Sequence, residues 1–120
     1  MKKLLFALAL SAVFLPSAHA KVSVKISQDP GAHYWILKNE RNVNGVRYVI
    51  TQRTDNTGYT TFEAREFYCE TKSFRSVTQG IPFSLEELKK SYTDRWIFIS
   101  WRDSPISRTI GEKACSQTVL

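Results

Sequence analysis

Cysteine and histidine are the residue types in this chain that most readily form covalent or metal bonds. Cys69 lies in the stretch EFYCETKSFRSV, residues 66–77, and Cys115 lies near the C-terminus. The two cysteines can form a disulfide, ligate a metal ion, or leave one of them as a reactive thiol. A reactive thiol needs a nearby base, which is usually a histidine. A zinc site needs about four ligands, and Cys69, Cys115 and His33 do not have a recognised zinc spacing.

The N-terminal stretch MKKLLFALALSAVFLPSAHA bears on this choice. It begins with Lys2 and Lys3, continues with an apolar run, and ends in the small-residue pattern Ala18-His19-Ala20. This order is typical of a secretory signal peptide, and the apolar run is too short to span a bilayer. A short N-terminal anchor is the alternative. We therefore predict a signal peptide over residues 1–20, cleaved after Ala20, and one periplasmic or secreted domain over residues 21–120 with no transmembrane segment.

Export favours the disulfide, because two cysteines in an oxidising compartment usually pair. Loss of His19 with the signal peptide would leave His33 as the only histidine. A disulfide between Cys69 and Cys115 would close a long loop, which is worth about 3 to 4.7 kcal/mol of stability in the chain-entropy model. A metal site and a reactive thiol stay open as less favoured alternatives.

The remaining polar residues do not form a recognisable catalytic pattern. The acidic residues lack the context of a glycosidase pair, and the sequence has no Gly-rich phosphate loop and no nucleophile elbow. Ser104 and Ser107 fit the start of a helix better than a nucleophile. A small hydrolase would require a carboxylate beside His33 in a pocket. We therefore expect a protein that is not an enzyme and that uses no metal and no cofactor.

Aromatic and basic residues indicate binding instead. Several of them fall on predicted strands, and a sheet has two faces of which only one is easily covered. Tyr, Trp and Arg dominate protein interfaces, although ordinary sheet surface is the alternative interpretation. The residues that we predict to form an exposed aromatic-basic face are Trp35, Tyr48, Tyr59, Arg47, Arg65, Lys72 and Arg75.

The charge of the chain limits the kind of partner. The formal net charge is +6, and it falls by two if Lys2 and Lys3 leave with the signal peptide. A mild positive charge favours acidic partners such as glycans, but a nucleic-acid binder usually has denser clusters of Lys and Arg. We predict an unidentified protein or an acidic glycan as the partner, no nucleic acid, and a homodimer as a further option.

The apolar pattern predicts strands that would position these residues. Residues 22–26, 34–39 and 46–54 read as strands, separated by turns at 27–33 and 42–45, and Asn44-Gly45 is a strong hairpin signal. After a turn at 55–58, residues 59–77 read as one long strand with a bulge near 64–66, where the apolar register changes. Residues 95–101 are apolar on both faces and predict a central strand that is covered on both sides.

Two short helices complete the predicted fold. Ser84 and Glu87 form a capping box, and Phe83 and Leu88 predict a hydrophobic staple. This helix would contact the sheet through Leu85, Leu88 and Tyr92.

Ser104-Pro105 predicts the start of a second helix, whose small apolar face carries Gly111, Ala114 and Cys115. The sequence therefore predicts an α+β domain: a curved antiparallel sheet of about five strands, covered by one or two short helices. The C-terminal helix would be linked to the sheet by the Cys69–Cys115 disulfide.

Three stretches of the C-terminal half resemble a known family. EFYCETKSFRSV, RWIFIS and SPISRTIGEKAC, at residues 66–77, 95–100 and 104–115, are similar to segments of the small exported proteins grouped with bacterial surface-adhesin E. The resemblance implies an α+β fold with paired cysteines. For the better-known adhesins, it implies binding to host extracellular-matrix or plasma proteins.

We therefore predict a small exported, non-catalytic, adhesin-E-like protein that contacts a protein or a glycan through its sheet face. The alternative function is a periplasmic inhibitor or immunity protein, for example one that blocks a lysozyme. Such a protein would insert a protruding rigid loop, at residues 27–33 or 55–58, into a catalytic cleft.

Overall fold

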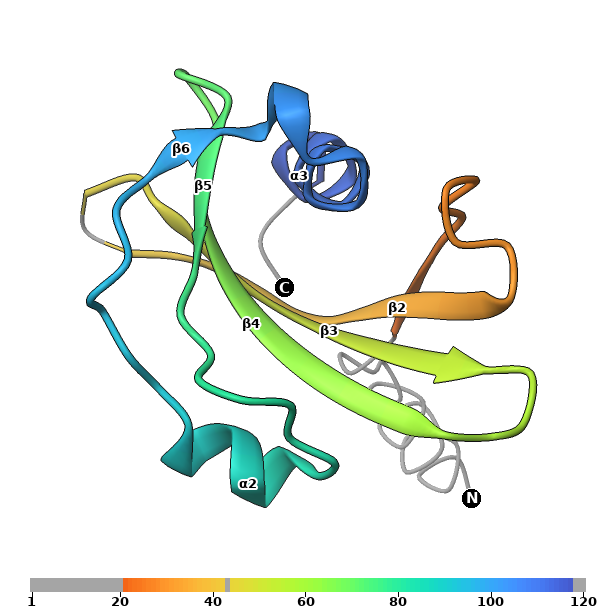
Figure 1. Ribbon diagram of the computed structural model, residues 1–120. Coiled ribbons are helices and arrows are strands. Elements are labelled where there is room, and N and C mark those ends of the chain that lie inside the picture. The colour runs from red at the N-terminus through yellow and green to blue at the C-terminus, as the bar shows by residue number, and fades with distance from the viewer. Residues whose placement is uncertain (1–20, 43, 118–120) are drawn as a thin grey trace, which may run out of the picture.

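The computed structural model describes residues 21–42 and 44–117, which form a six-stranded antiparallel sheet with two α-helices (Figure 1). The predicted signal peptide lies outside these described residues. The strands are β1 (Val22–Val24), β2 (Ala32–Arg41), β3 (Arg47–Asp55), β4 (Thr60–Tyr68), β5 (Ser73–Ser76) and β6 (Ile99–Ser100). The helices are α2 (Leu85–Lys90), the 3-10 helix η1 (Trp101–Asp103) and α3 (Pro105–Cys115). The α+β prediction is confirmed, with six strands in an open sheet instead of about five.

The strands lie in the sheet in the same order as in the chain, and each pairs with the next. The sheet is curved, with α3 inside the curve and α2 on the outer side (Figure 1). The inner face carries the larger apolar core, which includes Ile36, Val49, Phe67 and Ile110. The outer face carries a smaller cluster of Ala64, Val77 and Leu88, with Leu88 contributed by α2.

Two cores explain why the apolar register of residues 59–77 changes. Phe62 and Ala64 pack with the outer cluster, whereas Phe67 belongs to the inner core, so that the strand needs no bulge between them. The prediction of one bulged strand is wrong: β4 and β5 are separate strands joined by a turn at 69–72, in which Lys72 has a φ of +53°. The structure places a bulge in β2 instead, between Ile36 and Lys38.

The prediction of a central strand over residues 95–101 is also wrong. Only Ile99–Ser100 is a strand, and it pairs with β5 at the edge of the sheet. Trp101 is buried in η1, whereas Trp96 and Ile97 are 51% and 78% exposed. The run 95–101 lacks a regular alternation of polar and apolar residues because Trp101 enters the core, whereas the apolar residues Trp96, Ile97 and Ile99 lie on the surface.

Helix α2 has the predicted N-terminal cap. The backbone N–H of Glu87 donates to Oγ of Ser84 over 3.1 Å, and Oε1 of Glu87 accepts from the backbone N–H of Phe83. Leu88 is its buried residue, whereas Leu85 and Tyr92 are exposed, so that the predicted sheet contact through these two residues is wrong. Phe83 is exposed as well.

Helix α3 starts at Pro105 after Ser104, as predicted, and lies very close to the sheet. A Cβ atom added to Gly111 would lie 2.8 Å from Cε1 of Phe67, and still closer to the ring of Trp101. The Cys69–Cys115 disulfide is confirmed and joins the β4–β5 turn to the last residue of α3, with a Cα–Cα distance of 5.7 Å. Among the described residues, no helix is both long and apolar enough to cross a membrane.

Candidate binding surface

The structure distributes the seven predicted face residues over different parts of the molecule. Residue pairing across β3 and β4 puts Arg47 and Arg65 on the inner face with Phe67, and both arginines are buried. Trp35 and Tyr48 lie on the outer face, where Arg75 pairs with Glu66 across β4 and β5. Tyr59 and Lys72 occupy the β3–β4 and β4–β5 turns. These residues therefore do not form one continuous surface.

Arg47 holds the C-terminal end of α3. Its Nη1 donates to the carbonyl oxygens of Ala114 and Gln117, over 2.9 and 3.1 Å, and to Oδ1 of Asn39 over 3.2 Å. A cation at the C-terminus of a helix also interacts favourably with the helix dipole. Burial, and secondly the charge of Arg41, lower the pKa of Arg47 from its ordinary value. Its contacts are those of a structural residue.

Trp35 lies in a small aromatic-basic spot on the outer face. The ring of His33 packs at 4.2 Å from that of Trp35, and Nζ of Lys21 lies 5.5 Å from the centre of the Trp35 ring. Nε2 of His33 is hydrogen-bonded to Oγ of Ser23. The partner in this hydrogen bond is therefore a hydroxyl group and not the carboxylate that the hydrolase alternative requires. Tyr48 packs instead against the cluster around Leu88, and burial raises its pKa.

The largest group of exposed apolar side chains lies between β5 and β6. We call residues 81–99 the 81–99 segment; it contains α2 and the extended chain that follows it (Figure 1). Seven of its large hydrophobic side chains are exposed: Ile81, Phe83, Leu85, Tyr92, Trp96, Ile97 and Ile99. Tyr59 extends the group, since its ring packs on Phe83 with 5.4 Å between the ring centres. These side chains are the densest run of exposed large hydrophobic residues along the described chain, and exposed apolar surface that is contiguous typically marks an interaction site.

The backbone of the 81–99 segment is fixed against the sheet. Residues 77–79 pair with residues 91–93 through an N–H···O bond from Thr93 to Val77, at 2.9 Å, and another from Gln79 to Ser91, at 2.7 Å. The exposed side chains are therefore presented on an ordered chain.

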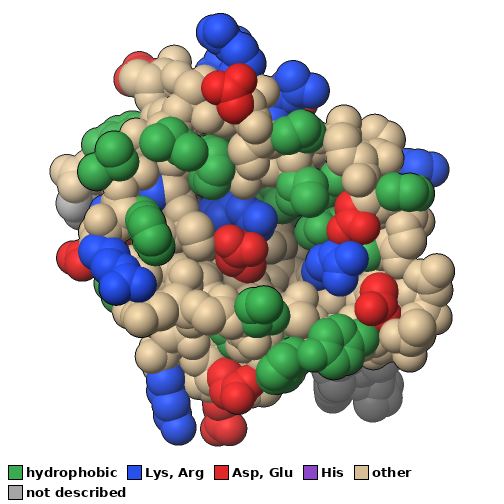
Figure 2. All heavy atoms as spheres, in the orientation of Figure 1, with side chains coloured by type: hydrophobic (Ala, Val, Ile, Leu, Met, Phe, Trp, Pro, Cys, Tyr) green, Lys and Arg blue, Asp and Glu red, His purple; other side chains and the backbone are tan. Residues whose placement is uncertain are grey.

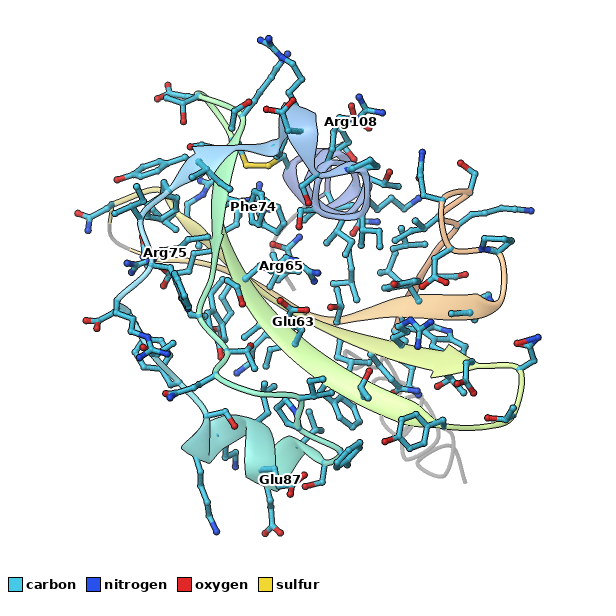
Figure 3. All side chains as sticks on the ribbon, in the orientation of Figure 1. Glu63, Arg65, Phe74, Arg75, Glu87 and Arg108 are labelled. Carbon is cyan, nitrogen blue, oxygen red and sulfur yellow. A yellow bond between two sulfur atoms is a disulfide. The ribbon has the colours of Figure 1, made fainter. Side chains whose placement is uncertain are left out.

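Arg75 anchors the second half of the segment. Its Nη1 donates to the carbonyl oxygens of Asp94 and Trp96, over 2.9 and 3.1 Å, while its Nε donates to Oε1 of Glu66. The guanidinium also lies 4.9 Å from the centre of the Phe98 ring, which packs on Tyr68. Figure 3 shows Arg75 beside the chain that leads from α2 to β6. Arg75 was predicted to belong to the face that contacts the partner. In the structure, its hydrogen bonds hold the stretch of chain that carries Trp96 and the neighbouring exposed side chains.

Trp96 has a basic neighbour of its own, since the guanidinium of Arg95 lies 5.2 Å from the centre of its ring. Both residues are exposed, and Ile97 follows them with the highest exposure among the large hydrophobic residues. A second aromatic-basic surface, apart from the small spot around Trp35, is thus present at residues 95–97. Sequence reasoning missed it because the run RWIFISW was interpreted as a buried strand.

The two loops that were expected for an inhibitor lie at the end of β3 that carries Asp55, where Tyr59 also contacts Phe83 of the 81–99 segment. The turn at 27–31 is held by Asp29, whose Oδ2 accepts from Nε of Arg53 over 2.8 Å and from the hydroxyl of Tyr34 over 2.7 Å. The hydrogen bond from Arg53, and then that from Tyr34, lower the pKa of Asp29. Burial, followed by the neighbouring Asp29, raises the pKa of Tyr34 to about 12.

The β3–β4 turn is equally well fixed. Oδ1 of Asp55 accepts from the backbone N–H groups of Thr57 and Tyr59, over 2.9 and 3.0 Å. The backbone N–H of Asn56 donates to the carbonyl of Gly31, which joins this turn to the neighbouring loop. The two loops therefore form one rigid end of the molecule.

No protein-family model, curated protein or solved structure matches this chain. The resemblance to the adhesin E family therefore stays a prediction. In the described part of the chain, no group of three or more His, Cys, Asp or Glu side chains is placed to hold a metal ion.

Proposed function

We propose that this protein is a small exported, non-catalytic binding protein that contacts another protein through the 81–99 segment. The observation that carries the proposal is the succession of seven exposed large hydrophobic side chains along one ordered segment. A pre-ordered surface loses little conformational entropy on binding, which favours affinity. Trp96 with Arg95 provides the residue types that most often dominate binding energy at interfaces.

Two further observations support this proposal. The Cys69–Cys115 disulfide fits a protein of an oxidising compartment, either periplasmic or extracellular. The stretch 95–100, which resembles the adhesin E proteins, lies in the second half of the 81–99 segment. That resemblance makes a host matrix or plasma protein the partner class to test first.

A capture experiment tests the proposal. The oxidised protein is immobilised and exposed to host matrix and plasma proteins, with sulfated glycans, at moderate salt, which screens a merely cationic attraction. We expect retention of a defined protein, and the double variant Trp96→Ala/Ile97→Ser should lower that retention about tenfold or more.

Trp35→Ala is the matched control, because it removes the same type of side chain from the outer sheet face. If Trp35→Ala abolishes retention and the double variant leaves it unchanged, the partner binds the sheet face and not the 81–99 segment. Retention of a sulfated glycan alone would contradict a protein partner.

The inhibitor function is the second candidate, and the rigid loop end at residues 27–31 and 55–58 favours it. A loop that blocks a catalytic cleft must keep its shape, and Asp29 and Asp55 fix these two turns. The producing cell's own envelope extract serves as a second pool in the same experiment. The inhibitor function would be established if the wild type captures a cell-envelope enzyme, the Asn56→Arg variant no longer captures it, and the Trp96→Ala/Ile97→Ser variant still does.

A further inference from the structure

A polar cleft lies between α3 and the sheet, beside the first residues of the 81–99 segment. It has a volume of about 280 Å³ and lies between the N-terminal half of α3, strands β3 and β4, and the chain at Gly80 and Ile81. Figure 2 shows this hollow in the middle of the molecule, with basic and acidic side chains at its centre. Figure 3 shows Glu63 and Arg65 inside the curve of the sheet, below α3.

The charge in this cleft is unusual for the interface between a helix and a sheet. The centre of the inner face is apolar, with Ile36, Val49 and Phe67 in its core, but here Glu63 and Arg65 of β4 lie opposite Thr51 and Val49 of β3. The side chain of Arg65 is only 9% exposed. Burying a guanidinium costs free energy unless it is paired and hydrogen-bonded, so a buried arginine that faces a cavity suggests a functional role.

Arg65 has donors to spare. A guanidinium carries five N–H groups. Nε donates to Oγ of Ser107 over 3.0 Å, Nη1 to Oγ1 of Thr51 over 3.1 Å, and Nη2 to Oε1 of Glu63 over 3.2 Å. Within the described residues, one N–H on each Nη atom is therefore left without a protein acceptor. These N–H groups fit an acceptor that enters the cleft.

The surrounding charges restrict the ligand to a single negative charge. Glu63 pairs with Arg65 through Oε1, and its other oxygen, Oε2, accepts from Oγ of Ser76, so that Glu63 is held beside the cleft. It would repel a dianion. Arg53, which also lines the cleft, is paired with Asp29 at 2.8 Å. The N-terminal end of α3 adds a partial positive charge.

The cleft also has an apolar wall, formed by Ile81 and Ile106. Its volume lies just below the usual range for ligand pockets, which is about 300 to 1,000 Å³. We propose that this cleft binds a small organic monocarboxylate, with its carboxylate on Arg65 and its apolar part against this wall. The site does not rest on the proposed function, because Ile81 is the only exposed hydrophobic residue of the 81–99 segment among its lining residues, and the capture experiment tests Trp96 and Ile97 instead.

Titration of the oxidised protein with benzoate, followed by ¹H–¹⁵N NMR, tests this site. We expect saturable shifts of the Arg65 side-chain N–H signal and of the Ile106 and Ser107 amides. Benzamide, which lacks the charge, and inorganic phosphate should bind about tenfold more weakly or not at all, because hydrogen bonds to charged groups are the stronger ones. Equal binding of benzamide, or shifts that do not saturate, would overturn the proposal.

Two variants show whether the shifts report on the cleft. Arg65→Lys should weaken benzoate binding about tenfold, because it removes the planar donor fork. If Arg65→Lys does not fold, Thr61→Trp tests whether benzoate binds in the cleft. The tryptophan would fill the cleft, and the structure shows no side-chain hydrogen bond of Thr61 that the change would remove. Thr60→Trp is the control on the opposite face of the sheet, because neighbouring residues of a strand face opposite sides; it also removes the hydrogen bond between the hydroxyls of Thr60 and Thr54. Unchanged benzoate shifts in Thr61→Trp would place the binding elsewhere.

The same titration distinguishes two sources of the carboxylate. N-acetylalanine presents it as a peptide C-terminus does, whereas benzoate presents it on a free acid. Tighter binding of N-acetylalanine assigns the cleft to a chain terminus, and tighter binding of benzoate assigns it to a free organic acid. Both results support a carboxylate site, and a failure of both ligands contradicts it without affecting the 81–99 proposal.

Discussion

At the scale of single residues, three buried or half-buried arginines make the contacts that organise this molecule. Arg47 reaches the end of α3, Arg53 holds Asp29 in the first loop, and Arg75 holds the chain at residues 94–96. Each joins parts of the chain that are distant in sequence. Their planar donor groups suit this role because one guanidinium can bind several acceptors at once.

Asp29→Asn tests the first-loop contact through its pH dependence. The pKa of Asp29 is lower in the folded state than in the unfolded chain, where it is about 3.9. Its ionised form therefore stabilises the fold above that pH, and this contribution disappears as the pH falls through the folded-state pKa. Urea unfolding should show Asp29→Asn to be less stable than the wild type near neutral pH, by about 1 to 3 kcal/mol. The two proteins should converge on acidification; a gap that stays constant with pH would contradict the assignment.

Arg47→Met tests the contact at the end of α3. The variant leaves Asn39 and the carbonyl oxygens of Ala114 and Gln117 without their donor, so we expect a loss of about 2 to 3 kcal/mol in the free energy of unfolding. Arg41→Ala, an exposed change on the same strand pair, should cost less than about 0.5 kcal/mol. Equal effects of the two changes would show that Arg47 does not support α3.

These arginine contacts were beyond sequence reasoning. Lys and Arg are mostly exposed, so Arg47 and Arg65 were assigned to a surface. The acceptor of Arg47 on Ala114 lies 67 residues away, and that of Arg65 on Ser107 lies 42 away. No local pattern predicts a contact over such separations. The Asp29 turn and the Ser84 cap, in contrast, were predictable because their signals are local.

At the scale of elements, local signals predicted the hairpins and the starts of both helices. The Asn44-Gly45 and 55–58 turns lie where expected, and Gly45 and Gly58 both have positive φ values, of 82° and 89°. The errors fall where the apolar pattern has two possible causes. The sheet is covered on both faces near β4, and residues 95–99 lie on the surface, so periodicity alone misassigned both regions.

Gly111→Ala tests the packing of α3 on the sheet. Alanine normally stabilises a helix relative to glycine by about 1 kcal/mol. Here its Cβ would overlap the rings of Trp101 and Phe67, so we expect a loss of about 1 to 3 kcal/mol instead. Glu112→Ala, the neighbouring exposed position on the same helix, should be close to neutral. Thermal unfolding measures both, and a stabilised Gly111→Ala variant would show that α3 sits farther from the sheet.

At the scale of the whole molecule, the disulfide joins the helix layer to the sheet. It connects residues that are 46 positions apart. Cys69→Ser should lower the melting temperature by about 10 °C or more and leave Cys115 as a free thiol, because a loop of this length contributes about 3 to 4.7 kcal/mol. Differential scanning calorimetry and a thiol titration measure these effects. Reduction of the wild type should reproduce the shift, and a variant that melts like the parent would contradict the stabilising role.

The sequential order of the strands has a consequence for the time course of folding. From β1 to β5, every strand pairs with its neighbour in the chain, so these pairings close only short loops and form quickly. The connection between β5 and β6 is the long one, and α3 must return across β3 before Cys115 meets Cys69. We expect the hairpins around β3 to form first and α3 to dock last. Oxidation of the two thiols then locks a nearly finished molecule, so the disulfide preserves the fold and does not guide the chain towards it.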